Sequence, residues 1–162
     1  MKLVAILAAF FGLVALPAQA ADVTVGALKI SAPWARATPK GASVGGAYMT
    51  ITNTGTAPDR LTGGSTTVAK SFEVHEMKMD NGVMKMRPVE GGIEIKPGQT
   101  VTLAPNGYHV MLMGMNQPLT QSQHFKATLQ FEKAGKVDVD FTVEGLGAMH
   151  GGSPGMGGMQ MK

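Results

Sequence analysis

The residues best suited to chemistry in this chain of 162 residues are histidines and methionines at alternate positions of predicted β-strands. In the stretch "YHVMLMGM", His109 is followed by Met111, Met113 and Met115. Side chains two positions apart on a strand point to the same face, about 6.6–6.8 Å apart along the backbone. One face of this strand therefore presents an imidazole and a row of thioethers.

A predicted hairpin earlier in the chain repeats the pattern. The letters "DNG" at 80–82 are a strong hairpin signal between two alternating runs. Imidazole or thioether side chains of equal parity lie on each arm: His75, Met77 and Met79 on the first, Met84 and Met86 on the second. Three strands thus each present such donors on one face, which a metal site needs and an ordinary core does not.

These donors indicate cuprous copper. Thioether is a soft, neutral ligand, and soft ligands select Cu(I) over hard cations. Zinc sites use histidine, cysteine or carboxylate instead. The chain has 13 methionines and no cysteine, so in an oxidising compartment its donors cannot be lost to disulfides. Weak donors also exchange metal quickly, which suits a carrier.

The candidate primary Cu(I) site consists of His75, Met86, His109 and Met111. Core packing is the weaker explanation for these four residues, because it would require His and Met to fall on the same face of several strands by chance. The other methionines of these strands are open to core packing, an apolar collar around the metal, or alternate ligation: Met77, Met79, Met84, Met113 and Met115. Met49 stands alone in its strand and is assigned to packing.

The elements that carry these residues are predicted to be short strands. We expect strands at 22–30, 45–53, 70–79, 83–89, 108–114, 124–135 and 136–145, with two brief strands around the turn "KPGQ" at 96–99. Residues 31–41 are predicted to be a connection. Turn signals recur about every 8–12 residues and no helical period is present, which favours an all-β fold, an antiparallel β-sandwich.

The two ends of the chain are expected to differ from the domain at 21–145. Residues 1–20 have the pattern of a signal peptide with cleavage after Ala20, and an uncleaved membrane anchor is the alternative. The apolar run is short for a span of about 20 residues. We therefore expect a periplasmic protein without stable membrane insertion. Residues 146–162 are glycine-rich and predicted to be a flexible tail.

Composition argues against several function classes. The net charge is +3, and the basic residues form no run or stripe, so nucleic acid is not an expected partner. A blue-copper electron carrier requires a cysteine ligand. A copper monooxygenase built on an N-terminal histidine would need one where Ala21 stands. Nucleophilic hydrolysis lacks a plausible Ser–His–Asp context, because His75 and His109 lie in methionine-rich strands. The protein is not expected to be an enzyme.

Four stretches carry a resemblance to a known family: "VHEMKMDNGVMKMRPV", "YHVMLMG", "APWARAT" and "GAYMTITNTGTAPDRLTGGST". Together they resemble the periplasmic PCuAC copper chaperones, over residues 28–143. The family's motif is His, ten residues, Met, about twenty-one residues, then His-x-Met. Here ten residues separate His75 from Met86, and twenty-two separate Met86 from His109. The extra residue fits a turn, where insertions cost little, and leaves Met84 as the alternative third ligand.

The resemblance implies a cupredoxin-like antiparallel β-sandwich of Greek-key type that binds one Cu(I) through two Met and two His. It implies delivery of copper to the dinuclear copper centre of cytochrome c oxidase, often beside a SCO-type thiol protein. A periplasmic copper-buffering or resistance protein without an oxidase target remains the alternative. Some members carry a His/Met-rich extension with a second site for Cu(I) or Cu(II), and five tail residues match it by composition: Met149, His150, Met156, Met159 and Met161.

Overall fold

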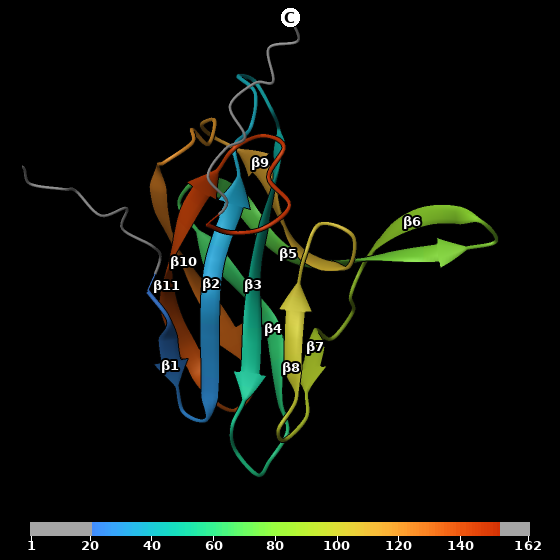
Figure 1. Cartoon of the computed structure of the whole chain (residues 1–162), viewed down its shortest axis with the longest axis vertical. Coiled ribbons are helices and arrows are strands. Elements are labelled where there is room, and N and C mark those ends of the chain that lie inside the picture. The colour runs from blue at the N-terminus through green and yellow to red at the C-terminus, as the bar shows by residue number, and fades with distance from the viewer. Residues whose placement is uncertain (1–20, 153–162) are drawn as a thin grey trace, which may run out of the picture.

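The computed structural model describes residues 21–152, which form eleven β-strands and no helix (Figure 1). The all-β prediction is confirmed. The strands are β1 Val23–Val25, β2 Leu28–Arg36, β3 Val44–Asn53, β4 Asp59–Thr66, β5 Ala69–Asp80, β6 Val83–Pro88, β7 Ile93–Ile95, β8 Thr100–Leu103, β9 Tyr108–Met115, β10 His124–Phe131 and β11 Gly135–Glu144. Across residues 21–152, no helix has the length and apolarity that a membrane span requires.

The strands form one sheet that closes on itself. The order runs β1-β2-β11-β10-β4-β5-β9-β3-β8, and an additional pairing of β2 with β3 joins the two ends of the ring. The contact between β11 and β2 is parallel, whereas the other pairings are antiparallel. In Figure 1, β2 and β3 lie in front of β10, β11 and β4, so the closed sheet is flattened into two layers around a core.

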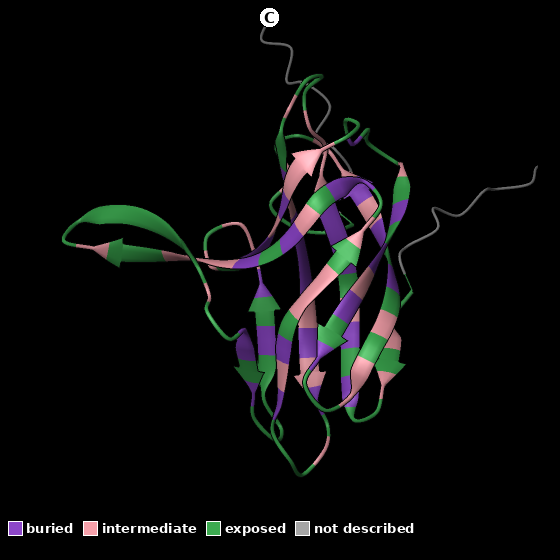
Figure 2. Cartoon of the chain, turned by 180° about the vertical axis from the view of Figure 1, so that it is seen from behind, coloured by how far each residue is buried: buried purple, intermediate pink, exposed green. Residues whose placement is uncertain are grey.

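The core is built from alternate residues of the strands. Figure 2 shows buried and exposed residues as bands along them. Ile30, Ile51, Leu112, Leu129 and Phe141 have no exposed surface. Each such side chain contributes about 1.5–3 kcal/mol when it is fully buried. Met49 is 1 % exposed in this core and packs there, as predicted.

The predicted strand at 22–30 is wrong. Gly26 adopts a φ of 56°, a left-handed conformation that glycine tolerates, and the chain turns there so that β1 pairs back on β2. Strand β2 then continues to Arg36 through residues predicted to be a connection. Pro33 suggested a break because it has no N–H, but it lies where the β2–β3 register shifts and needs no donor.

Strands β4, β7 and β8 also differ from expectation. The turn at 96–99 does separate two brief strands, but these pair with different neighbours, β7 with β4 and β8 with β3. Strand β4 is not among the predicted strands. Gly63 and Gly64 interrupt the alternation of side chains that would predict a strand. Pairing with β10 places this segment in the sheet.

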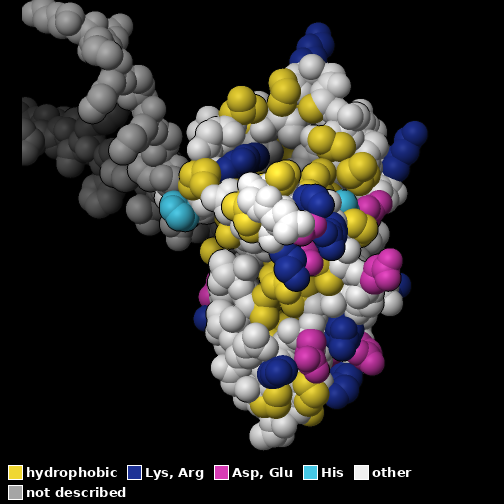
Figure 3. All heavy atoms as spheres, turned by 90° about the vertical axis from the view of Figure 1, so that its right-hand side faces the viewer, with side chains coloured by type: hydrophobic (Ala, Val, Ile, Leu, Met, Phe, Trp, Pro, Cys, Tyr) yellow, Lys and Arg dark blue, Asp and Glu magenta, His cyan; other side chains and the backbone are white. Residues whose placement is uncertain are grey.

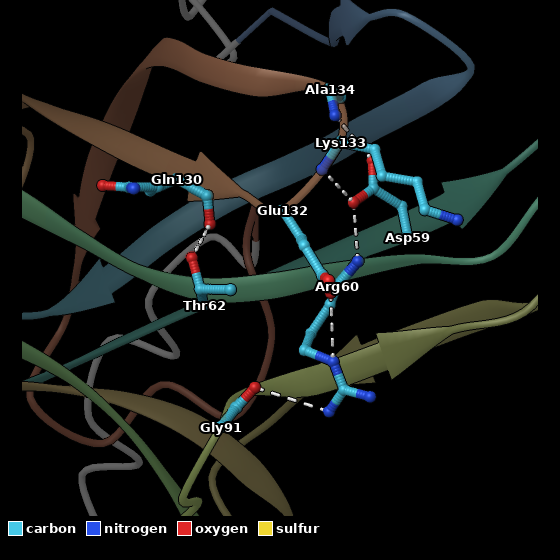
Figure 4. Close-up of polar contacts among 8 residues, drawn as sticks. All are labelled: Asp59, Arg60, Thr62, Gly91, Gln130, Glu132, Lys133 and Ala134. Carbon is cyan, nitrogen blue, oxygen red and sulfur yellow. Dashed lines mark hydrogen bonds and ion pairs between the residues drawn. The ribbon is translucent and has the colours of Figure 1, made fainter.

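Asp59 holds the β10–β11 turn against the start of β4 (Figure 4). Its Oδ1 accepts hydrogen bonds from the backbone N–H of Arg60 and Lys133, at 2.7 and 2.9 Å, and its Oδ2 accepts one from Ala134 at 2.9 Å. Burial alone would raise the pKa of Asp59, but these three hydrogen bonds outweigh it and hold the pKa below its ordinary value. Both carboxylate oxygens are therefore committed to the fold.

Candidate metal centre

The hairpin of β5 and β6 projects away from the closed sheet (Figure 1), and every residue of β6 is exposed. Asn81 and Gly82 have φ values of 51° and 80°, as a type I′ turn requires, so the hairpin predicted from "DNG" is confirmed. Strand β6 pairs with β5 alone among the strands at 21–152. The far half of the hairpin is thus a two-stranded arm.

The two faces of this arm differ in chemistry. Met77 pairs with Met86 and Met79 pairs with Met84, which places four thioethers on one face. The alternate positions form the other face: Glu76, Lys78, Asp80, Lys85 and Arg87. Figure 3 shows hydrophobic side chains on one side of the projecting arm and charged side chains on the other.

The two predicted histidine ligands are direct cross-strand neighbours. His75 on β5 pairs with His109 on β9, and their ring centroids are 6.0 Å apart. The adjoining Val74 and Val110 are buried in the core, so both imidazoles point to the outer face of the sheet. That face continues onto the thioether face of the arm, because His75 and Met77 are two residues apart on one strand.

His109 presents a lone pair to the sulfur of Met86. The Nδ1 of His109 lies 3.0 Å from the carbonyl oxygen of Gly107, which can only accept, so Nδ1 carries the hydrogen. In the neutral ring Nε2 is then unprotonated, and it lies 3.2 Å from Met86 Sδ. In that neutral tautomer the imidazole lone pair faces the thioether sulfur, an arrangement that a shared cation would stabilise.

His75 is held by a residue that the sequence analysis did not single out. Its Nε2 lies 3.0 Å from Glu73 Oε2 and donates to that carboxylate. Its Nδ1 is buried and has no hydrogen-bond partner among the described residues. A carboxylate on one ring nitrogen and a free lone pair on the other is the arrangement that metal-binding histidines use. Glu73 is two residues before His75, a same-face spacing that could have revealed it.

Glu73 is itself fixed in position. The hydrogen bond from His75, followed by one from the Ser71 hydroxyl at 3.1 Å to Oε1, holds the pKa of the Glu73 carboxyl below its ordinary value. The carboxylate therefore stays ionised at neutral pH and keeps its hydrogen bond from His75. It acts through the ring of His75, as a positioning residue.

Met111 lies on the same outer face, one step from the histidine pair. It pairs with Glu73 on one side and with Gly46 of β3 on the other, and it is half-buried. The structure thus brings His75, Met86 and His109 into direct proximity and adds Met111 by register. Farther along β9, Met113 is half-buried, whereas Met115 packs against the core. Met84, the alternative ligand, lies one pair farther out than Met86.

The donor set is mixed nitrogen and sulfur. Among the described residues, no group of three His, Cys, Asp or Glu side chains is placed to hold a metal ion. The side-chain donors that the structure places beside the histidine pair are thioethers, with Met86 Sδ 3.2 Å from His109 Nε2. Two imidazoles and two thioethers suit Cu(I) and do not suit zinc or hard cations.

Within residues 146–152, the described start of the tail, Ala148 and Met149 lie against Arg36 of β2. Arg36 donates from Nε to the Ala148 carbonyl at 2.7 Å and from Nη2 to Met149 Sδ at 3.0 Å. Gly152 N–H donates to Glu144 Oε1 at 2.9 Å. His150 is exposed. The other tail candidates, Met156, Met159 and Met161, lie outside the described residues, as do residues 1–20 with the predicted cleavage after Ala20.

The fold and the site together define an all-β domain with an outward-facing His/Met donor set on one sheet and its projecting hairpin. Residues 28–143 match the LpqE-like family, and the chain belongs to that family. A curated protein of Leifsonia xyli subsp. xyli named "Putative lipoprotein" is 34 % identical over 104 residues. That match covers 64 % of this chain and 61 % of the relative, so the chain spans only about three fifths of it.

Solved structures of PCuAC domains resemble this chain closely. The copper-bound PCuAC domain from PmoF2 is 32 % identical, with a TM-score of 0.66, covering 77 % of this chain and 98 % of the domain. A solution structure of the Cu(I) form of DR1885 from Deinococcus radiodurans is 29 % identical, with a TM-score of 0.57, covering 76 % of this chain and 80 % of that one. The PCuAC resemblance predicted from the sequence is confirmed.

Proposed function

We propose that this protein is a periplasmic copper chaperone that binds Cu(I) through His75, Met86, His109 and Met111. The observation that carries the proposal is the close contact of an imidazole nitrogen with a thioether sulfur, His109 Nε2 to Met86 Sδ at 3.2 Å. The unpartnered Nδ1 of His75 lies on the neighbouring strand. Similarity to copper-bound and Cu(I)-bound PCuAC structures supports the same conclusion.

Neutral donors near the surface suit transfer better than storage. Imidazole and thioether add no negative charge, so they stabilise a monovalent soft ion without trapping a divalent one. Met86 is 49 % exposed, and a partner can replace its weak bond to copper without opening the core. The protein needs to hold and release its cargo and performs no covalent chemistry.

The expected recipient is the dinuclear copper centre of cytochrome c oxidase, with a SCO-type thiol protein as a further partner. Export through the signal peptide at 1–20, with cleavage after Ala20, and a Greek-key, cupredoxin-like description of the sandwich belong to the same proposal. Copper buffering without an oxidase target uses identical ligands. Transfer to an acceptor, and not binding alone, therefore separates delivery from sequestration.

The tail is proposed as a second, weaker copper site that uses Met149, His150, Met156, Met159 and Met161. Its described part supports this proposal in one respect. Arg36 anchors the chain at Ala148, so the two donors that follow start from a defined place on the sheet. Cu(I) and Cu(II) both remain candidate ions there, because imidazole accepts either and thioether favours the first.

The test is Cu(I) binding by the mature protein, measured under anaerobic conditions by competition with a chromogenic chelator. His109→Ala should weaken binding of the first equivalent by more than about 100-fold, because loss of a ligand exceeds the loss of an outer-shell partner. Stability should change by about 1 kcal/mol or less, because the Gly107 carbonyl still accepts from Met77 N–H.

Unchanged affinity in both His109→Ala and Met111→Ala would refute the site. Transfer is tested by offering the Cu(I)-loaded protein to the isolated copper-binding domain of the oxidase subunit. Movement of copper to that domain supports delivery, and retention at equal protein concentrations supports buffering.

A further inference from the structure

Two methionines at the tip of the β5–β6 arm do not pack. Met79 is 60 % exposed and Met84 is 44 % exposed, and the two are cross-strand partners. Neither belongs to the hydrophobic core or to the residues packed against it. Core packing, the usual role of methionine, therefore does not explain them, and exposed thioethers on a projecting arm need another reason.

Their geometry brings sulfur atoms together. Side chains directly opposite on antiparallel strands have Cβ atoms about 4.5–5.5 Å apart, which applies to Met79 and Met84. Met77 follows two positions along the same face, about 6.6–6.8 Å away. Each methionine has three rotatable side-chain bonds, so the three sulfurs can converge on one point above the arm.

The arm is well suited to hold such a cluster. Six consecutive pairs, from His75 with Pro88 to Asp80 with Val83, keep its two strands in register. On the opposite face, Asp80 forms ion pairs with Lys85 at 2.7 Å and Arg87 at 3.0 Å. The charged groups of the arm thus lie on the other face, and the thioether face presents soft, neutral donors without a competing carboxylate.

We propose that Met77, Met79 and Met84 form a second Cu(I) site at the tip of the arm, which takes up the ion and passes it to the histidine pair. The inference rests on the proposed Cu(I) function. Its three donors are thioethers without imidazole, so this site binds more weakly than the His/Met site. Met86 connects the two sites, because it pairs with Met77 and its sulfur reaches His109 Nε2.

The experiment titrates the full mature chain with Cu(I) alone, without oxygen, and follows the methionine ε-methyl signals by NMR. The first equivalent should shift Met86 and Met111, and further equivalents should shift Met77, Met79 and Met84, whether or not the tail signals also respond. Met79→Leu keeps the apolar surface and removes one sulfur from the tip without touching Met84, the alternative ligand of the His/Met site. It should weaken the tip site by about tenfold or more and change first-equivalent affinity by less than about twofold. Transfer of Cu(I) from a chelator to the histidine pair should become slower.

The matched control is Lys78→Gln/Lys85→Gln, a cross-strand pair on the opposite face of the same arm. It should leave the tip signals responsive to Cu(I). If Met77, Met79 and Met84 stay silent at three equivalents while only the tail signals of Met149 and its neighbours shift, the tip site is refuted. The same holds if Met79→Leu changes neither the binding of equivalents beyond the first nor the loading rate.

His109→Ala separates this proposal from the general one. If the first equivalent is lost and the tip signals still respond, both proposals stand. If the parent protein binds the first equivalent but the ε-methyl signals of Met77, Met79 and Met84 do not shift, the tip site is refuted and the proposed carrier function is unaffected. Unchanged first-equivalent binding in His109→Ala overturns the His/Met site, whatever the tip signals do.

Discussion

The polar groups at Asp59 and those at the histidine pair differ in one respect: whether their hydrogen-bonding atoms are used by the fold. Asp59 accepts three backbone N–H groups, and both of its oxygens are satisfied. His75 donates from Nε2 to Glu73, and its Nδ1 has no partner. His109 donates from Nδ1 to the Gly107 carbonyl, and its Nε2 contacts Met86 Sδ. Both clusters lie in ordered β-structure, so order alone does not distinguish them.

The difference separates polar groups that the fold satisfies from groups that are available to a ligand. A buried polar atom without a partner is costly and therefore rare in native proteins. His75 Nδ1 is such an atom, and a metal ion bound there would offset its cost. On the proposed function, the satisfied carboxylate of Asp59 serves the structure and the imidazole of His75 serves the metal site.

The largest effect should come from Asp59→Ala. It removes the acceptor for three backbone donors and should lower the free energy of unfolding by about 3 kcal/mol. Cu(I) affinity of the folded fraction should be unchanged. Chemical denaturation with and without copper checks both statements. Loss of copper affinity without loss of stability would break the contrast between the two clusters.

Asp59→Asn is the control for charge. Because folding lowers the pKa of Asp59, its contribution to stability is present above the ordinary carboxyl value of about 4. That contribution is lost as the pH falls through the lower folded-state pKa. The stability difference between parent and Asp59→Asn should therefore shrink in strongly acidic solution, and a constant difference would contradict the role of the charge.

Met86→Leu and Met84→Leu sharpen the assignment of the third ligand. Only Met86 has a sulfur at 3.2 Å from His109 Nε2. Because a thioether is a weaker donor than an imidazole, Met86→Leu should weaken first-equivalent Cu(I) binding less than His109→Ala does, by about tenfold or more. Met84→Leu should leave it within about twofold. Chelator competition on both variants decides the matter, and the opposite ranking would make Met84 the ligand.

A smaller effect is expected from Glu73→Gln, which keeps the shape of the side chain and removes its charge. The amide holds the His75 ring less firmly, and Cu(I) affinity should fall by about tenfold, the lower end of the range for outer-shell partners. The ring signals of His75 should show a changed tautomer balance in ¹⁵N NMR. Unaltered tautomer and affinity together would show that Glu73 does not position His75.

Much of the site was predictable from local sequence, and the reason is the period of a strand. Because side chains on a strand alternate with a period of two, His75 shares a face with Met77, and His109 with Met111. The letters "DNG" predicted the turn that brings Met86 opposite Met77. The same reasoning failed at residues 22–36. Local propensity gave the wrong strand bounds there, because the chain turns at Gly26 and Pro33 lies at a shift in the β2–β3 register. Pairing of β2 with β3 decides the conformation of these residues.

By itself, the sequence determined which chemistry is available: soft neutral donors, no thiolate, and strands that place those donors on single faces. Only the tertiary structure decided that β5 and β9 pair in the register that sets His75 beside His109, and that Glu73 binds one ring nitrogen and leaves the other free. Registers between strands distant in the chain depend on packing of the whole closed sheet. Alternation within one strand depends only on the pleat of its own backbone.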